Sequence, residues 1–161
     1  MKTTSQPGKG SRFDVYLPAC SETPGIQSIQ KETKIKGGNQ SILFVDDETV
    51  LCTIFKASLS PFGYHVETFD KSEDALCFFK KNPARFDLII SDIILPGIPG
   101  DILVKKAREI KPGIPAILIT GSSNLINEQV IAELHINALL FKPITTTKMI
   151  ETIQTIFEGK E

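Results

Sequence analysis

Five short apolar runs recur along the last three quarters of the chain, and a segment of helical period separates each from the next. The runs are Ile42–Val45, Val66–Phe69, Leu88–Ile90, Ala116–Ile119 and Ala138–Phe141. Most of them are continuous rather than alternating in polarity, which is typical of strands buried on both faces of a parallel sheet. This pattern constrains the fold strongly, because successive parallel strands need a crossover between them, usually a helix.

The segments between and after these runs are amphipathic, and we expect a helix in each. Their apolar stripes are Val50, Leu51, Ile54, Phe55 and Leu59; Ala75, Leu76 and Phe79; Ile102, Leu103, Ala107 and Ile110; Ile126, Val130, Ile131 and Leu134; and Met149, Ile150, Ile153, Ile156 and Phe157. The order is therefore strand–helix five times over. Right-handed crossovers then give a doubly wound α/β sheet with helices on both faces. Such sheets bind ligands at the carboxyl ends of their strands.

The composition excludes several classes of protein. The chain has 161 residues, of which 41% are hydrophobic and 23% charged, and its formal net charge is −1. This suits one α/β domain plus extra sequence, and it provides no basic surface for nucleic acid. The first residues lack the apolar core of a signal peptide, and no apolar run approaches the roughly 20 residues that cross a bilayer. We expect a cytoplasmic domain that touches neither nucleic acid nor membrane, in a parent protein that membrane segments could anchor.

The cysteines and histidines do not form a metal-binding pattern. Cys20, Cys52 and Cys77 show no CxxC pairing, and the two histidines, His65 and His135, lie far apart in the sequence. A zinc site is therefore not expected. We expect the thiols to be small buried or half-buried side chains in a reducing cytosol.

Polar residues follow four of the five expected strands at the point where each strand ends. Asp46 and Asp47 follow the first, Asp92 the third and Thr120 the fourth, and Lys142 ends the fifth. Because parallel strands present their carboxyl ends at one edge of the sheet, we expect these five side chains to converge. Four strand ends meeting in this way are more specific than any one short motif.

The three acids of this set favour a hard cation. Asp46 and Asp47 could simply cap the helix that follows them, but one acid is enough for that. Two acids that oppose a third at Asp92 repel one another unless a cation lies among them. Mg²⁺ prefers few protein ligands and several waters, and we therefore expect Mg²⁺ as the cofactor.

Asp92 can act as a nucleophile toward phosphorus and form an aspartyl phosphate. Such a reaction needs the charge of the transferring group to be neutralised. Lys142 supplies a compact positive charge, and the hydroxyl of Thr120 can donate a hydrogen bond to a phosphoryl oxygen. Taken singly, Asp92 could be a turn residue, and Thr120 and Lys142 would more often be a strand former and a surface charge.

Four segments resemble the signature blocks of two-component receiver domains, in order and at the spacing of that family. They are Ile42–Glu48, Asp92–Gly100, Ile119–Gly121 and Phe141–Pro143. The resemblance covers about residues 40–158. It implies a flavodoxin-like three-layer fold of the (βα)₅ type with sheet order 2-1-3-4-5, and a chain that accepts a phosphoryl group from a phosphohistidine.

The resemblance also implies a role for each site residue. Asp92 is the phospho-acceptor, Asp47 and Asp92 bind Mg²⁺ directly, Asp46 binds it mostly through water, the backbone carbonyl of Ile94 adds a ligand, and Thr120 and Lys142 bind the phosphoryl group. The Lys142–Pro143 bond is cis in similar domains. The implied partner is a histidine kinase or a histidine phosphotransfer protein, and the expected state is a monomer or a weak homodimer.

Two departures from the family pattern bear on signalling. Receivers usually carry an aromatic residue three positions before the lysine, where this chain has Leu139. Coupling to the output surface is then weaker or runs through the backbone after Thr120. Ile94 and Ser122 stand two positions after Asp92 and Thr120, where they could alter the lifetime of the aspartyl phosphate.

The first 39 residues differ from the rest. In residues 6–18, Phe13, Val15 and Leu17 alternate with polar residues and predict one strand. The stretch resembles the last glycine box and final strand of a histidine-kinase ATP-binding domain. Residues 19–39 are polar, contain Pro and Gly, and read as a linker. We therefore interpret residues 1–18 as a remnant of that domain and residues 40–161 as the receiver of a hybrid sensor kinase, a fragment that neither binds ATP nor autophosphorylates.

Three other interpretations stay open on the sequence alone. One is a free-standing single-domain regulator with an unrelated tail. Another is an aspartate-nucleophile phosphohydrolase, although Ile94 stands where those enzymes carry a second acid. The third is an interaction module that works without phosphate, although such modules are expected to have lost an acid or the lysine.

Overall fold

The computed structural model describes residues 2–16, 37–121 and 135–158. The chain divides into two compact units, with the boundary between residues 33 and 34. The first unit contains a two-stranded hairpin and the second contains a five-stranded sheet with its helices. Within the described residues, no helix is both long and apolar enough to cross a membrane.

The sheet of the second unit is parallel throughout and confirms the expected strand order. Its strands are β3 (Ser41–Val45), β4 (His65–Phe69), β5 (Leu88–Asp92), β6 (Ala116–Thr120) and β7 (Ala138–Phe141). They lie side by side in the order β4-β3-β5-β6-β7, which is 2-1-3-4-5 counted within this unit. The inner strands β3, β5 and β6 are covered on both faces of the sheet. This explains why their sequences are continuous apolar runs rather than alternating ones.

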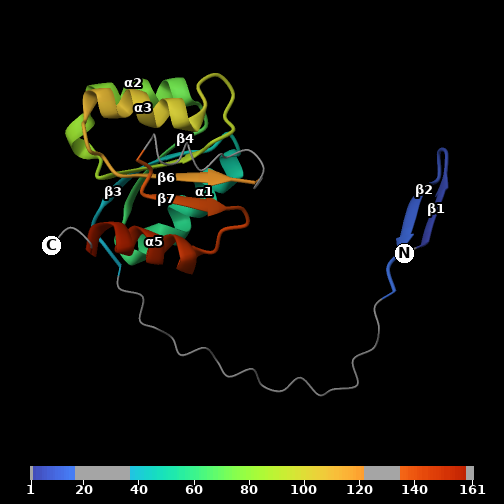
Figure 1. The fold of residues 1–161 in the computed structure, drawn as a ribbon. Helices are drawn as coiled ribbons and strands as arrows, with labels where there is room; N and C mark the ends of the chain where they lie inside the picture. The colour runs from blue at the N-terminus through green and yellow to red at the C-terminus, as the bar shows by residue number, and fades with distance from the viewer. Residues whose placement is uncertain (1, 17–36, 122–134, 159–161) are drawn as a thin grey trace, which may run out of the picture. The chain divides into compact units, whose positions relative to one another are not determined.

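Helices cover both faces of this sheet, as Figure 1 shows. The described helices are α1 (Thr49–Leu59), α2 (Ser72–Lys81), α3 (Gly100–Ile110) and α5 (Thr146–Glu158). Alternate residues of β3 divide between two cores. Ile42 and Phe44 pack with α1 and α5, whereas Leu43 and Val45 pack with α2 and α3. The expected helix at residues 126–134 lies outside the described residues.

The helical phase of α1 differs from the prediction. Its buried residues are Cys52, Phe55 and Leu59, which follow one another three and four positions apart and face the sheet. Val50 and Ile54 were expected on the same stripe, but they are 65% and 54% exposed. They lie about half a turn from Cys52 at 100° per residue, and therefore on the opposite side of the helix.

The hairpin of the first unit corrects the prediction for the N-terminal strand. Strand β2 spans Gly10–Asp14 rather than a stretch centred on Val15, and it pairs antiparallel with β1 (Lys2–Gln6). The turn between them uses Gly8, whose φ is +78°. The sequence concealed β1 because this strand is polar throughout and fully exposed, so no alternation marks it.

Candidate functional site

The polar residues at the strand ends meet at one edge of the sheet. Asp46 follows β3 directly, Asp92 is the last residue of β5, Thr120 is the last residue of β6, and Lys142 follows β7. The parallel sheet places these ends on the same side. Asp46, Asp92 and Thr120 are buried, whereas Asp47 is exposed.

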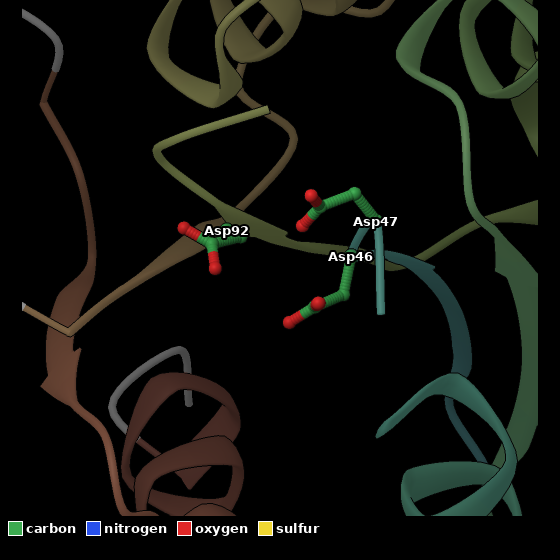
Figure 2. A group of neighbouring side chains, drawn as sticks. All are labelled: Asp46, Asp47 and Asp92. Carbon is green, nitrogen blue, oxygen red and sulfur yellow. The ribbon is translucent and has the colours of Figure 1, made fainter. Parts of the chain in front are cut away.

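The three aspartates form a compact acidic group. Each offers a carboxylate oxygen, and these oxygens lie within 4.8 Å of one another. Figure 2 shows the carboxylates of Asp46, Asp47 and Asp92 gathered around one small region. Asp46 is fully buried and Asp92 is 7% exposed, so water screens their mutual repulsion poorly.

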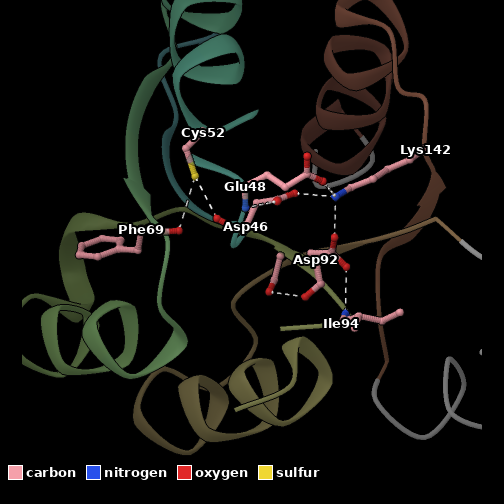
Figure 3. A network of polar contacts seen from close by, with 8 residues as sticks. Asp46, Glu48, Cys52, Phe69, Asp92, Ile94 and Lys142 are labelled. Atoms are coloured by element: carbon pink, nitrogen blue, oxygen red, sulfur yellow. Dashed lines mark hydrogen bonds and ion pairs between the residues drawn. The ribbon is translucent and has the colours of Figure 1, made fainter. Parts of the chain in front are cut away.

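Lys142 forms ion pairs with this acidic group. Its Nζ lies 2.6 Å from Oδ2 of Asp92, 2.9 Å from Oδ2 of Asp46 and 3.6 Å from Oε1 of Glu48 (Figure 3). Burial lowers the pKa of Lys142, but the bonds to Asp92 and Asp46 outweigh it and raise this pKa above its ordinary value. The lysine therefore stays charged. Burial also raises the pKa of Asp46, although Lys142 opposes that shift.

Backbone amides orient the two buried carboxylates. The N–H of Glu48 donates to Oδ1 of Asp46 over 3.0 Å, and the N–H of Ile94 donates to Oδ1 of Asp92 over 2.9 Å. Each carboxylate thus has one oxygen held by a backbone donor two residues later and the other held by Lys142. A carboxylate that is already held in place needs little reorganisation energy when it reacts.

Cys52 forms hydrogen bonds to the backbone next to the acidic group, a role that the sequence did not reveal. Its Sγ donates to the carbonyl of Asp46 over 3.3 Å and to that of Phe69 over 3.6 Å (Figure 3). Burial and the nearby charge of Asp46 raise the pKa of this thiol to about 11, so it remains neutral. Cys77, expected to be at least half-buried, is exposed instead, and Cys20 lies outside the described residues.

The sheet links Thr120 to the lysine. Thr120 is paired with Phe141, and its carbonyl accepts a hydrogen bond from the N–H of Lys142 over 2.8 Å. The Lys142–Pro143 bond is cis, as expected. Leu139 is half-buried and packs against the core beside α2 and α3. Ser122 lies outside the described residues, and the side chain of Ile94 is 57% exposed.

The donor set suits a small divalent cation. The carboxylates of Asp46, Glu48 and Asp92 pair with one ammonium group, and Asp47 adds a further carboxylate beside Asp46 and Asp92, so acidic side chains outnumber the basic one. All the candidate ligands are oxygens, which is the preference of Mg²⁺. Asp46, Asp47 and Asp92 each offer one carboxylate oxygen that could bind such an ion.

Comparison with known proteins agrees with this geometry. The family model described as "Response regulator receiver domain" matches residues 42–154. Among solved structures, a CheY-like receiver domain protein from Methanospirillum hungatei is 29% identical, with a TM-score of 0.69 over 76% of this chain and 96% of that one. A receiver domain protein from Clostridium thermocellum is 26% identical, with a TM-score of 0.70 over 75% and 96% of the two chains.

Curated relatives fall into two groups. The transcriptional regulatory protein ZraR of Salmonella typhimurium is 31% identical over 73% of this chain and 26% of its own length. The sensor kinase CckA of Brucella abortus is 24% identical over 98% of this chain and 18% of its own length. The sensor protein EvgS of Escherichia coli O157:H7 is 28% identical over 88% of this chain and 12% of its own length. The chain thus spans about a quarter or less of each of these relatives.

Proposed function

Since the chain belongs to the response regulator receiver domain family, whose function is phosphoryl acceptance in two-component signalling, we propose that Asp92 is its acceptor. The donor is a phosphohistidine, and Mg²⁺ held by Asp46, Asp47, Asp92 and the carbonyl of Ile94 assists. The observation that carries the proposal is the geometry of Asp92, a buried carboxylate fixed by a backbone amide and by Lys142.

In the proposed transfer, one carboxylate oxygen of Asp92 attacks the phosphorus atom. An O–P bond forms and the P–N bond to the donor imidazole breaks, and its electron pair stays on the departing nitrogen. Bound Mg²⁺ supplies positive charge that neutralises the phosphoryl oxygens. No proton has to leave Asp92, because a carboxylate is already the nucleophilic form.

Lys142 and Thr120 bind the phosphoryl group. In the structure Nζ of Lys142 lies 2.6 Å from Oδ2 of Asp92. When Asp92 becomes an acyl phosphate, the negative charge moves to the phosphoryl oxygens, and Lys142 is close enough to pair with them. The Thr120 hydroxyl is a donor of suitable type at the neighbouring strand end. Because the Thr120 carbonyl accepts from the Lys142 amide, a movement of either residue is transmitted to the other.

We also propose that the chain derives from a hybrid sensor kinase, with residues 1–18 from the ATP-binding domain and residues 19–39 as a linker. The alignments support this. The relatives named as sensor kinases or sensor proteins align with 88–98% of the chain, whereas the transcriptional regulators ZraR and PhoP align with 73–76%. The additional alignment with the sensors is expected if the N-terminal segment is also shared with them. The partner is then a histidine kinase or a histidine phosphotransfer protein.

Intact mass spectrometry tests the proposal after incubation with acetyl phosphate and Mg²⁺. We expect one adduct of about 80 Da, as for an aspartyl phosphate, and its loss in Asp92→Asn. Asp101→Asn is the matched control, because Asp101 is an aspartate of α3 outside the acidic group. No adduct at any Mg²⁺ concentration would favour an interaction module that works without phosphate. Continuous turnover of phosphate monoesters would favour a phosphohydrolase.

A further inference from the structure

Two buried serine hydroxyls fix the loop that follows Asp92, and neither takes part in the transfer described above. Ser72 and Ser91 are both fully buried. The hydroxyl of Ser72, in the first turn of α2, donates to the carbonyl of Ile98 over 2.6 Å. The hydroxyl of Ser91 donates to the carbonyl of Asp92 over 2.9 Å. The loop of residues 93–99 is thus held at both ends.

The same loop passes beside the first turn of α2. Gly97 has a φ of +77°, and a Cβ at this position would meet the carboxylate at the end of the Glu73 side chain. Within the loop, the N–H of Gly100 donates to the carbonyl of Ile93 over 3.0 Å. The position of the loop therefore depends on the position of α2. The hydrogen bond from the Ser72 hydroxyl to the Ile98 carbonyl joins the helix to the loop directly.

We propose that Ser72 is a positioning residue of the cation site, which acts through this loop to set the affinity for Mg²⁺. The inference rests on the proposed function, in which the loop carries the Ile94 carbonyl ligand. Mg²⁺ demands near-ideal octahedral geometry, so a small displacement of one ligand lowers affinity. Without the hydroxyl, the Ile98 carbonyl loses a donor in a partly buried setting, and a loop that shifts to recover one moves Ile94 with it.

The test compares Ser72→Ala with Ser58→Ala. Ser58 is the matched control because its half-buried hydroxyl also donates to a carbonyl, that of Phe55 over 3.2 Å, within α1. Mg²⁺ alone is titrated into ¹⁵N-labelled protein, and the rate of modification by acetyl phosphate is then measured at low and at saturating Mg²⁺.

We expect the Mg²⁺ dissociation constant of Ser72→Ala to rise roughly three- to tenfold, as the loss of one coupled hydrogen bond implies. The acetyl phosphate rate should fall at low Mg²⁺ and return to the wild-type rate at saturation. The control should stay within about twofold of the wild type in both. The comparison is made where urea denaturation in EDTA shows each variant to be fully folded, because a partly unfolded variant would show the same split through coupled folding.

An unchanged dissociation constant in folded Ser72→Ala would overturn the inference, and so would an equal rise in Ser58→Ala. Ser72→Gly, which also lacks the hydroxyl, should show the same rise. If neither Ser72 variant folds, the hydroxyl serves stability rather than the cation site, and the inference is again overturned. A wild-type chain that takes up neither Mg²⁺ nor a phosphoryl group would instead refute the proposed function.

Discussion

Lys142 offers a sharp test of the electrostatics of the site, through its replacement by Met, which keeps the length of the side chain and removes the charge. In the wild type its ammonium bonds to Asp46 and Asp92 over 2.9 and 2.6 Å. Hydrogen bonds to charged groups contribute about 1.5–3 kcal/mol each. The Lys142 side chain is 23% exposed, so water recovers part of the loss. We expect Lys142→Met to lower the free energy of unfolding by about 2 kcal/mol in EDTA.

Added Mg²⁺ should narrow the difference in stability between wild type and Lys142→Met. The cation neutralises the same carboxylates, and the variant no longer offers it a competing ammonium, so the variant should bind Mg²⁺ more tightly. Mg²⁺ stabilises both proteins, and at saturation the difference between them narrows by about 1.4 kcal/mol for each tenfold by which the variant binds Mg²⁺ more tightly. Phosphoryl acceptance should nevertheless fall, because Lys142 is also proposed to bind the transferring group.

Urea denaturation, in EDTA and across a Mg²⁺ series, measures both quantities. Lys148→Met is the control, since Lys148 is an exposed lysine of α5 away from the acidic group. Equal stability of wild type and Lys142→Met in EDTA, together with parallel Mg²⁺ dependence, would refute the reasoning. It would mean that Lys142 contributes no net stabilisation to the buried carboxylates.

Other substitutions test the packing around the site. Gly100→Ala should lower stability by about 1–3 kcal/mol and slow phosphoryl acceptance, because the added Cβ would collide with the backbone carbonyl of Asp92; a wild-type urea midpoint would contradict this. Leu59→Ala should cost about 2–5 kcal/mol, since Leu59 is fully buried, as a denaturation curve would show. In a Cys20→Ser background at pH 8, Cys77 should react promptly with a thiol reagent and Cys52 only on unfolding, because the pKa of Cys52 is raised to about 11. The stability advantage of the wild type over Cys52→Val should shrink as pH rises from 9 toward 11, since the unfolded thiol ionises first.

The sheet and the convergence of its polar residues were predictable because both follow from chain topology. Parallel strands with helical crossovers leave their carboxyl ends at one edge whatever the details of packing, so Asp46, Asp92 and Lys142 had to approach one another. The helical phase of α1 was not predictable in the same way. Val50 and Ile54 are as apolar as the buried Phe55, and only packing against the sheet decides which face turns inward.

Contacts between segments distant in sequence were also beyond pattern reasoning. The Ser72 hydroxyl reaches Ile98, 26 residues away, and Ser72 looks like an ordinary first-turn serine in the sequence. Cys52 gave no signal either, because a lone thiol in a helix has no motif. In both cases the polar atom is buried, and burial obliges it to find a partner. Such partners become visible only when the layers of the fold are assembled.

The proposed phosphoryl transfer offers one explanation for the exposed apolar side chains near the site, which is that a donor protein buries them. The proposed transfer to Asp92 requires a donor imidazole to come within bonding distance of a mostly buried carboxylate, and the proposed donor protein would then cover this edge of the sheet. Ile94, two positions after Asp92, and Phe141, directly before Lys142, are 57% and 51% exposed. Large apolar side chains are costly to leave in water when a partner can bury them. Replacement of Phe141 by Ser should therefore weaken transfer from a phosphohistidine protein while leaving modification by acetyl phosphate unchanged. An equal loss with both donors would show that this side chain acts on the site itself rather than on the donor protein.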